Sequence, residues 1–411
     1  MALLSHLRRM DPSNGNRFIR EVGAWTARKK RLAWLPKALR LKLADGAVTR
    51  VAGSLPEHFN RLVLIVSHEL AAAGAPKALA EVVIACRNQD WAVIVVGPAD
   101  GPYTDILVKH GALVVVSDHA LDALSPAVSL SKFADVIVCN TIACAHVVAR
   151  LPAKKVAWYL HETGAIDTYL EHFPWISQSI RQVCDVWAAS NLVSDKIFQI
   201  RPYAFILEAG CEAVNIPLPP NTDTVKSLVL GSLEPRKGQD LLVDAYRQLA
   251  PNERSNLRVD LYGRILDIDF ASKLQLAIDN TPGLSYCGVL APSAAINALR
   301  DAHMVIICSR DEPLSLVAVE AMSAQRIVVC STAVGIAAYL QDGVNAYIAP
   351  SCKPHDLAET IARALKDRTN WQTIGRAGND VYYRYFSSDV FQRKVIERLK
   401  FIMEGDIKQN C

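Results

Sequence analysis

The sequence has no hydrophobic run that approaches the roughly 20 residues of a membrane-spanning helix. Its first residues, MALLSHLRRMDPSNGNRF, contain no long apolar core, so we do not expect a secretory signal. It also lacks the bias of disordered or fibrous chains, since 51% of its residues are hydrophobic and 21% are charged. A chain of 411 residues with this composition is expected to form two globular domains.

The motifs of several common site classes are also absent. No CxxC pair and no Cys/His cluster has zinc-binding spacing. The turn after the first strong apolar run is not GxGxxG, which disfavours a nicotinamide or flavin site. No DxD-like carboxylate pair directly follows an apolar run, so we expect neither a metal site nor a cofactor.

Ten cysteines are present, but their neighbours indicate buried thiols. Cys86, Cys139, Cys308 and Cys330 lie in or beside apolar runs, where a thiol packs as a small hydrophobic group. We therefore expect a reduced, cytoplasmic protein, with any membrane contact peripheral and on the inner face of the cell membrane.

Short β-branched runs alternate with helix-forming stretches from residue 62 onward, a pattern typical of buried parallel strands. The first series comprises 62–67, 92–97, 112–117, 135–139, 155–160 and 185–190. A proline-rich segment at 216–222 interrupts the alternation and suits a linker. The second series comprises 227–232, 257–263, 284–288, 304–309, 326–331 and 346–350.

Two tandem βα series predict an α/β chain with two doubly wound, Rossmann-like domains that face a central cleft. Ligands of such sheets bind at the carboxyl ends of the strands, so substrates should lie between the domains. We divide the chain into a basic N-terminal extension (1–60), two Rossmann-like domains (61–218 and 219–382) and a C-terminal segment (383–411).

Glu312 and Glu320 form the strongest candidate site. They are eight positions apart in a segment where Pro313 and Ser315 mark a turn into a helix of about ten residues. Glu312 then lies before the helix and Glu320 about 7 Å along its axis. The helix N-terminus between them favours a diphosphate, while the carboxylates accept hydrogen bonds from the hexose and ribose hydroxyls of a sugar nucleotide. The plainer alternative is two solvated glutamates near a helix end.

Arg236 and Lys237 form a basic pair directly after the first run of the second series. At a strand-to-helix junction such a pair points into the cleft, where it can stabilise charge on a diphosphate leaving group without a metal. The alternative is an ordinary exposed pair, with Gly238 serving the turn.

Gly74 and His161 are weaker candidates. Gly74 follows the first run in the segment SHELAAAGAPK, where Gly and Ala allow close backbone approach and Pro76 fits the first helical position. His161 follows the run 155–160, at the end of a strand that faces the cleft. A satisfied structural histidine is the alternative for His161.

Together these segments resemble the retaining glycosyltransferase family 4, the group 1 glycosyltransferases with the GT-B fold. Glu312 and Glu320 match the Glu-x7-Glu motif, and Arg236 and Lys237 match the basic pair of the family. Gly74 looks like part of the glycine-rich donor loop, and His161 falls at the position of the acceptor-side histidine. The resemblance covers about 62–405. The segment 385–388 with its following helix resembles the closing segment that crosses back to the first domain.

The resemblance implies transfer of a sugar from a nucleotide-diphosphate sugar, with retention of configuration and no obligatory metal. Residues 61–218 would bind the acceptor and residues 219–382 the donor. The implied catalytic residues are Glu312, His161, Arg236 and Lys237. The implied donor-binding residues are Gly74, Arg236, Lys237, Arg264, Val289, Leu290, Ser315, Leu316 and Glu320. The implied acceptor is a glycan or lipid-linked molecule of cell-envelope polysaccharide or lipopolysaccharide biosynthesis, and no nucleic acid partner is implied.

Three departures from the family pattern bear on the donor more than on the class of reaction. Leu314-Ser315 stands where the family usually has Phe-Gly, so we expect a side chain to intrude where an amide should meet phosphate. The segment 208–212 replaces the customary N-G-V-D, and Arg264 replaces a second acidic-glycine pair.

Three rival interpretations are a hydrolysing 2-epimerase, a sugar phosphorylase (for which no pyridoxal lysine segment is evident) and a catalytically silent GT-B partner protein.

The charge is unevenly distributed, because residues 1–60 hold 12 Lys and Arg against 4 Asp and Glu. The apolar residues Trp25, Leu32, Leu35, Leu39 and Leu43 fall in a narrow sector at helical spacing. Arg28 intrudes on that stripe, but Arg31, Lys37, Arg40 and Lys42 lie off it, which predicts that residues 1–50 bind an anionic membrane surface. The alternative is a helical extension packed on the first domain, and Pro36 interrupts any single long helix.

Overall fold

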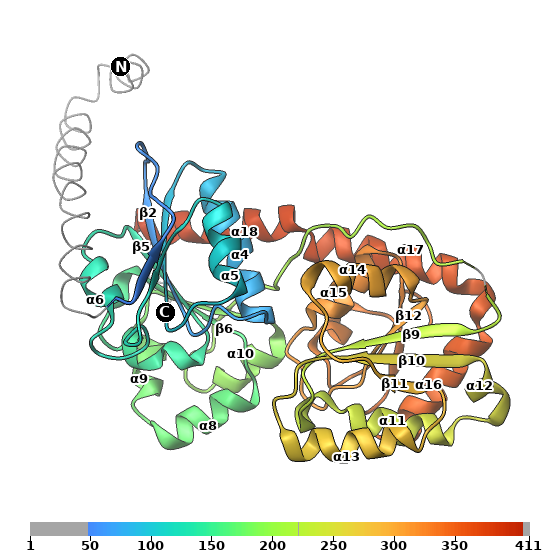
Figure 1. The fold of residues 1–411 in the computed structure, drawn as a ribbon. Coiled ribbons are helices and arrows are strands. Elements are labelled where there is room, and N and C mark those ends of the chain that lie inside the picture. Colours follow the sequence, from blue (N-terminus) through green and yellow to red (C-terminus); the bar gives the residue numbers. More distant parts are fainter. Residues whose placement is uncertain (1–47, 221, 406–411) are drawn as a thin grey trace.

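The computed structural model describes residues 48–220 and 222–405, which form two α/β domains connected by the coil that precedes residue 225 (Figure 1). The predicted membrane-binding stripe from Trp25 to Leu43 lies outside the described residues. Within the described ranges, no helix has the length and hydropathy needed to cross a bilayer.

The first domain contains an eight-stranded sheet in the order β1-β4-β3-β2-β5-β6-β7-β8. Neighbouring strands are parallel except for the antiparallel pair of β1 and β4. The strands are β1 (Arg50–Ala52), β2 (Leu62–Ser67), β3 (Ala92–Gly97), β4 (Leu113–Val116), β5 (Val136–Asn140), β6 (Val156–Leu160), β7 (Asp185–Ala188) and β8 (Phe205–Ile206). The connecting helices are α4 (Gly74–Arg87), α5 (Pro102–Lys109), α6 (Pro126–Leu130), α7 (Ala145–Val148), α8 (Gly164–His172), α9 (Ile176–Gln182) and α10 (Asn191–Ile197).

The second domain contains a six-stranded, fully parallel sheet in the order β11-β10-β9-β12-β13-β14. Its strands are β9 (Val225–Leu230), β10 (Leu257–Tyr262), β11 (Leu284–Tyr286), β12 (Met304–Ile307), β13 (Ile327–Ser331) and β14 (Tyr347–Ala349). Its helices are α11 (Gln239–Gln248), α12 (Pro251–Ser255), α13 (Ile268–Asp279), α14 (Pro292–Asp301), α15 (Leu316–Ser323), α16 (Pro354–Lys366) and α17 (Trp371–Val381).

All twelve apolar runs predicted as strands form strands within one or two residues of their expected ends, which confirms the α/β fold class. The reason is visible in their burial, since every residue of β2 and β3 is buried. Helices cover both faces of each sheet, so a strand in the middle needs apolar side chains on both sides (Figure 1). The predicted burial of Cys86, Cys139, Cys308 and Cys330 is also confirmed.

The helix α18 (Ser388–Glu404) leaves the second domain and packs on α4 of the first (Figure 1). A π-helical turn, Tyr382–Phe386, precedes it. Phe391, Val395 and Leu399 of α18 are fully buried in the core of the first domain. Gly210 fits beside this helix because a Cβ there would lie 2.7 Å from Phe391 Cβ.

Two short strands were not predicted. β1 comes from the range assigned to the basic extension, and its three residues pair with β4 at the edge of the sheet. β8 has only two residues and closes the opposite edge. Both are held by pairing with a neighbour, and neither is long enough to show an alternating pattern in the sequence.

Candidate functional site

Each sheet has one topological switch point, where the loops after two neighbouring strands lead to opposite halves of the sheet. In the first domain this point lies between β2 and β5, and in the second between β9 and β12. Crevices at the carboxyl ends of such strands are the usual ligand sites of doubly wound sheets. The loops and helices that follow β2, β9 and β12 carry seven of the eleven residues predicted as the site.

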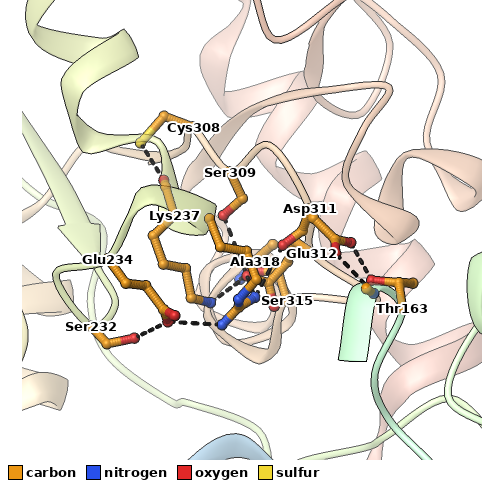
Figure 2. Close-up of polar contacts among 12 residues, drawn as sticks. Thr163, Ser232, Glu234, Lys237, Cys308, Ser309, Asp311, Glu312, Ser315 and Ala318 are labelled. Atoms are coloured by element: carbon orange, nitrogen blue, oxygen red, sulfur yellow. Dashed lines mark hydrogen bonds and ion pairs between the residues drawn. The ribbon is translucent and has the colours of Figure 1, made fainter. Parts of the chain in front are cut away.

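The loop after β12 ends at Ser315, which is the N-cap residue of α15. Ser315 has φ 81°, a left-handed conformation that is unusual for a non-glycine residue. Its Oγ accepts a hydrogen bond of 3.3 Å from the Ala318 amide (Figure 2). The serine side chain therefore caps the helix and occupies one first-turn amide, which agrees with the expectation that a side chain stands where an amide would meet phosphate.

Glu312 lies in this loop, and the predicted basic pair reaches it from the segment after β9. The ion pair of Glu312 with Lys237 is drawn in Figure 2. Its Oε2 forms an ion pair with Lys237 Nζ, lies 3.7 Å from an Arg236 guanidinium nitrogen, and accepts from Ser309 Oγ at 3.3 Å. The Glu312 side chain is only 14% exposed. The structure thus brings Arg236, Lys237 and Glu312 together from segments that are 75 residues apart.

Arg236 is held by two further contacts. One guanidinium nitrogen donates to the Asp311 carbonyl at 3.0 Å and another to Glu234 Oε1 at 3.0 Å. Behind the loop, the Gly335 amide donates to the Glu312 carbonyl at 2.8 Å. A Cβ at position 335 would lie 1.8 Å from the Pro313 carbonyl oxygen, so only glycine permits this close support.

Glu320 lies in the second turn of α15 and faces the first domain. It forms an ion pair with Lys77, which lies in the first turn of α4. A Cβ at Gly74 would have Leu316 Cδ1 as its neighbour at 3.8 Å, an ordinary contact. The two helices therefore begin opposite each other across the cleft. Pro76 is the third residue of α4, and its predicted place at the first helical position was wrong.

Arg264, Val289 and Leu290 lie after the carboxyl ends of β10 and β11. The Arg264 guanidinium is 4.0 Å from Glu69 Oε2 of the first domain. The hydrogen bond and charge of His68, and then the charge of Arg264, lower the pKa of Glu69. Val289 is 68% exposed, whereas Leu290 is half-buried. These residues line the edge of the second sheet on the side of β9 away from Glu312.

His161 follows β6 and is fixed by neighbours in the first domain. Its Nε2 is 2.7 Å from Asn140 Oδ1, and its ring centroid is 3.9 Å from that of Tyr159. Asn140 Nδ2 donates to the Ala75 carbonyl, so it is the acceptor oxygen Oδ1 of Asn140 that faces the histidine. The His161 Nε2 atom therefore carries the proton and donates it to Oδ1. Burial, then the charge of His68, lowers the pKa of His161 to about 3. His161 is therefore a neutral ring whose Nδ1 can accept a hydrogen bond.

Other polar groups surround His161 at the carboxyl ends of β2 and β5. The Glu162 carboxylate accepts from the amides of Ile142 and His161, and burial raises its pKa. Among the described residues, the buried Nδ1 of His68 has no hydrogen-bond partner. This side of the cleft is suited to groups that both donate and accept, such as sugar hydroxyls.

The facing parallel sheets and the residues gathered at their switch points define a protein of the GT-B class. Residues 215–380 match the family described as glycosyl transferases group 1, and residues 59–195 match glycosyl-transferase family 4. The chain therefore belongs to the group 1 glycosyltransferases of family 4.

Relatives of this chain share part of its sequence. An uncharacterized glycosyltransferase of Methanocaldococcus jannaschii is 27% identical over 175 residues, 42% of this chain and 48% of that protein. The lipopolysaccharide 1,2-N-acetylglucosaminetransferase of Salmonella typhimurium is 29% identical over 180 residues, 42% of this chain and 47% of that protein. The chain thus spans about half the length of these curated relatives.

Solved structures share the fold. HepE of Anabaena in complex with UDP-glucose superposes with a TM-score of 0.70 at 21% identity, covering 83% of this chain and 100% of that one. Sucrose-phosphate synthase from Thermosynechococcus elongatus superposes with a TM-score of 0.68 at 15% identity, covering 84% and 100%. At these identities the likeness shows the GT-B fold.

Four residues of the site were not singled out from the sequence: Lys77, Asp311, Asn140 and His68. Asp311 accepts from Thr163 Oγ1 and from the Gly164 amide at the start of α8, which ties the Glu312 loop to the first domain (Figure 2). Lys77 had a signal, because a cation in the first turn of a helix is unfavourable unless an anion offsets it. Asp311 and Asn140 had none, since their partners are distant in sequence.

Proposed function

We propose that this protein is a glycosyltransferase that moves a sugar from a nucleotide-diphosphate donor to an acceptor with retention of configuration. The observation that carries the proposal is the pair Glu312 and Glu320 on either side of the α15 N-terminus, with Arg236 and Lys237 beside Glu312.

The donor would bind along this helix start. Ser315 Oγ occupies the Ala318 amide, so the amides of Leu316 and Val317 are the ones that, with the helix dipole, would favour a diphosphate. Glu312 would then accept from hexose hydroxyls and Glu320 from the ribose diol, because ionised carboxylates are pure acceptors. HepE of Anabaena, which has the same fold, is described with UDP-glucose bound, and this supports a nucleotide-sugar donor.

Charge on the leaving diphosphate grows as the sugar bond breaks. Arg236 and Lys237 would stabilise that charge, and the departing phosphate oxygen would take the proton of the acceptor hydroxyl on the same face of the sugar. We propose that no divalent metal is required, because fixed cations and helix amides can supply the positive charge. Turnover that survives EDTA supports this part, and loss that magnesium or manganese restores contradicts it.

The acceptor would lie against the polar groups of the first domain around His161. His161 Nδ1, His68 and Glu162 offer acceptors and donors for hydroxyls without a strong cation among them. The name of the Salmonella relative supports a glycan or lipid-linked acceptor of lipopolysaccharide or other cell-envelope assembly.

Residues 1–50 would hold the protein on an anionic membrane near a lipid-linked acceptor, on the basis of their charge and apolar stripe. Liposome flotation tests this proposal with the full-length chain and a variant that lacks residues 1–50. Full-length protein should float with anionic vesicles at low salt, and the deletion should abolish flotation. Binding that survives the deletion would place the contact elsewhere.

The central experiment is a thermal-shift screen of UDP, GDP, ADP, CDP and dTDP, since a ligand that binds only the folded state raises Tm. The matching labelled nucleotide sugars are then incubated with glycan acceptors, and the products are analysed. A glycosylated product with the donor's anomeric configuration supports the proposal. Formation of a free 2-epimer supports an epimerase, and binding without turnover supports a silent GT-B protein.

A further inference from the structure

Lys77 is a cation of the first domain that directly contacts the Glu-x7-Glu segment of the second domain. It lies in the first turn of α4 and forms an ion pair with Glu320, 243 residues away and across the cleft. Because Gly74 lies against Leu316, the ammonium group of Lys77 sits close to the N-termini of both α4 and α15. This is the region in which the proposed function places the donor diphosphate.

The position is unfavourable for a lysine taken alone. Burial opposes its charge, and the positive end of the α4 dipole does so as well. The charge and hydrogen bond of Glu320 more than offset the burial, so the pKa of Lys77 is raised. The lysine is therefore kept charged by one carboxylate, the same carboxylate that the donor ribose is proposed to use.

The charges around the proposed donor site balance one for one. Lys77 pairs with Glu320, Lys237 with Glu312, and Arg236 with Glu234 and Glu312. Three cations thus face three carboxylates, and a diphosphate brings additional negative charge to a set of groups that is neutral. Binding is favourable if the carboxylates turn to the donor hydroxyls, because the cations are then free to neutralise the phosphates.

We propose that Lys77 is a donor-binding residue supplied by the opposite domain: when the ribose diol engages Glu320, the Lys77 ammonium moves from Glu320 to the diphosphate. The donor then takes the place of a direct ion pair between the domains and bridges them itself. This inference rests on the proposed function, since it requires the nucleotide to occupy the α15 N-terminus.

The test measures binding by calorimetry to the nucleoside, monophosphate and diphosphate of the base that gives the largest shift in the thermal screen. Lys77→Met removes the charge while keeping most of the side-chain length. It should weaken diphosphate binding at least tenfold and leave nucleoside binding unchanged or tighter, because Glu320 is released. Lys77→Arg should restore most of the diphosphate affinity.

A matched control is Thr163→Ala, which removes a different cross-domain contact to this segment, the hydrogen bond from Thr163 to Asp311. Because Thr163 carries no charge, its loss should change nucleoside and diphosphate affinity by the same factor. Circular dichroism and Tm of each unliganded variant establish that it is folded.

Two results would overturn the role of Lys77 alone. Equal weakening of nucleoside and diphosphate binding by Lys77→Met would mean that the lysine only positions Glu320. Unchanged or tighter diphosphate binding would mean that it only competes for Glu320. If the wild-type protein binds none of the five diphosphates, the proposed donor site fails, and the role of Lys77 fails with it.

Discussion

The two sides of the cleft differ in how their polar groups are satisfied. On the second domain, Arg236, Lys237 and Glu312 are paired with opposite charges in their own domain. On the first domain, the neutral His161 is bonded to an asparagine, and His68 Nδ1 is buried with no hydrogen-bond partner among the described residues. The first group is held by ion pairs within its own domain, whereas the second contains a neutral ring and a buried nitrogen atom without a partner.

This difference matches the two substrates that the proposed reaction requires. A diphosphate is charged and can exchange places with ion-pair partners, whereas an acceptor glycan offers hydroxyls that satisfy unpaired nitrogen atoms. Because a buried polar atom without a partner costs about 1–3 kcal/mol, a hydroxyl that reaches His68 should bind favourably. The comparison therefore predicts that variants on the two sides will change different kinetic constants.

The largest effect is expected for Glu312→Ala and Glu320→Ala, which remove the carboxylates on either side of the α15 N-terminus. Each should lower turnover by about 100-fold or more, the scale of losing one preorganised group at a reacting centre. Transfer of labelled sugar measures the change, with circular dichroism as the control for folding. Near wild-type turnover in either folded variant would remove the donor site from this segment.

A somewhat smaller effect is expected for Arg236→Ala and Lys237→Ala. We expect each to lower kcat by about 10- to 100-fold and to change donor affinity less, because the leaving-group charge develops in the transition state. Steady-state kinetics with varied donor separates the two constants. A rise in KM at constant kcat would instead mean that these residues bind the ground state and transition state equally.

On the opposite side of the cleft, His68→Ala should raise the KM for acceptor by about tenfold, the equivalent of about one hydrogen bond. Donor affinity, measured by calorimetry with the nucleoside diphosphate, should stay at the wild-type value. A variant that lost donor affinity as well would show that the division between a donor side and an acceptor side is incorrect.

The smallest effect at neutral pH is expected for the folding stability of His161→Gln. The pKa of His161 is lowered to about 3 in the folded protein, so its contribution to stability is present above about pH 6.5 and is lost as the pH falls toward 3. In that window the wild type should lose up to about 1.4 kcal/mol per pH unit more than the variant. Urea unfolding at pH 7, 6, 5 and 4 measures this, and parallel curves would contradict it.

The fold was predictable where its physical cause is local. Buried parallel strands need β-branched runs on both faces, and such runs identified every strand from β2 to β14 except β8. The edge strands β1 and β8 were missed because short pairing at an edge leaves little pattern in the sequence.

The site was predictable only where its residues are close together in the sequence. The loop and helix around Glu312 could be read from the spacing of its glutamates, proline and serine. The contacts of Glu320 with Lys77, and of Asp311 with Thr163, join segments from different domains, and no local rule places them together. The left-handed backbone of Ser315, φ 81°, was not predictable, because serine is a preferred helix N-cap but usually caps in an extended conformation.

The crossing of α18 has a consequence for protein synthesis. The first domain is translated before the second, yet Phe391, Val395 and Leu399, which complete its core, are among the last described residues to leave the ribosome. At roughly 5–20 residues per second, the surface of α4 that they cover stays exposed for on the order of ten seconds or more. A nascent first domain therefore carries an open apolar strip on α4, where a chaperone can bind until α18 has been synthesised and packs there.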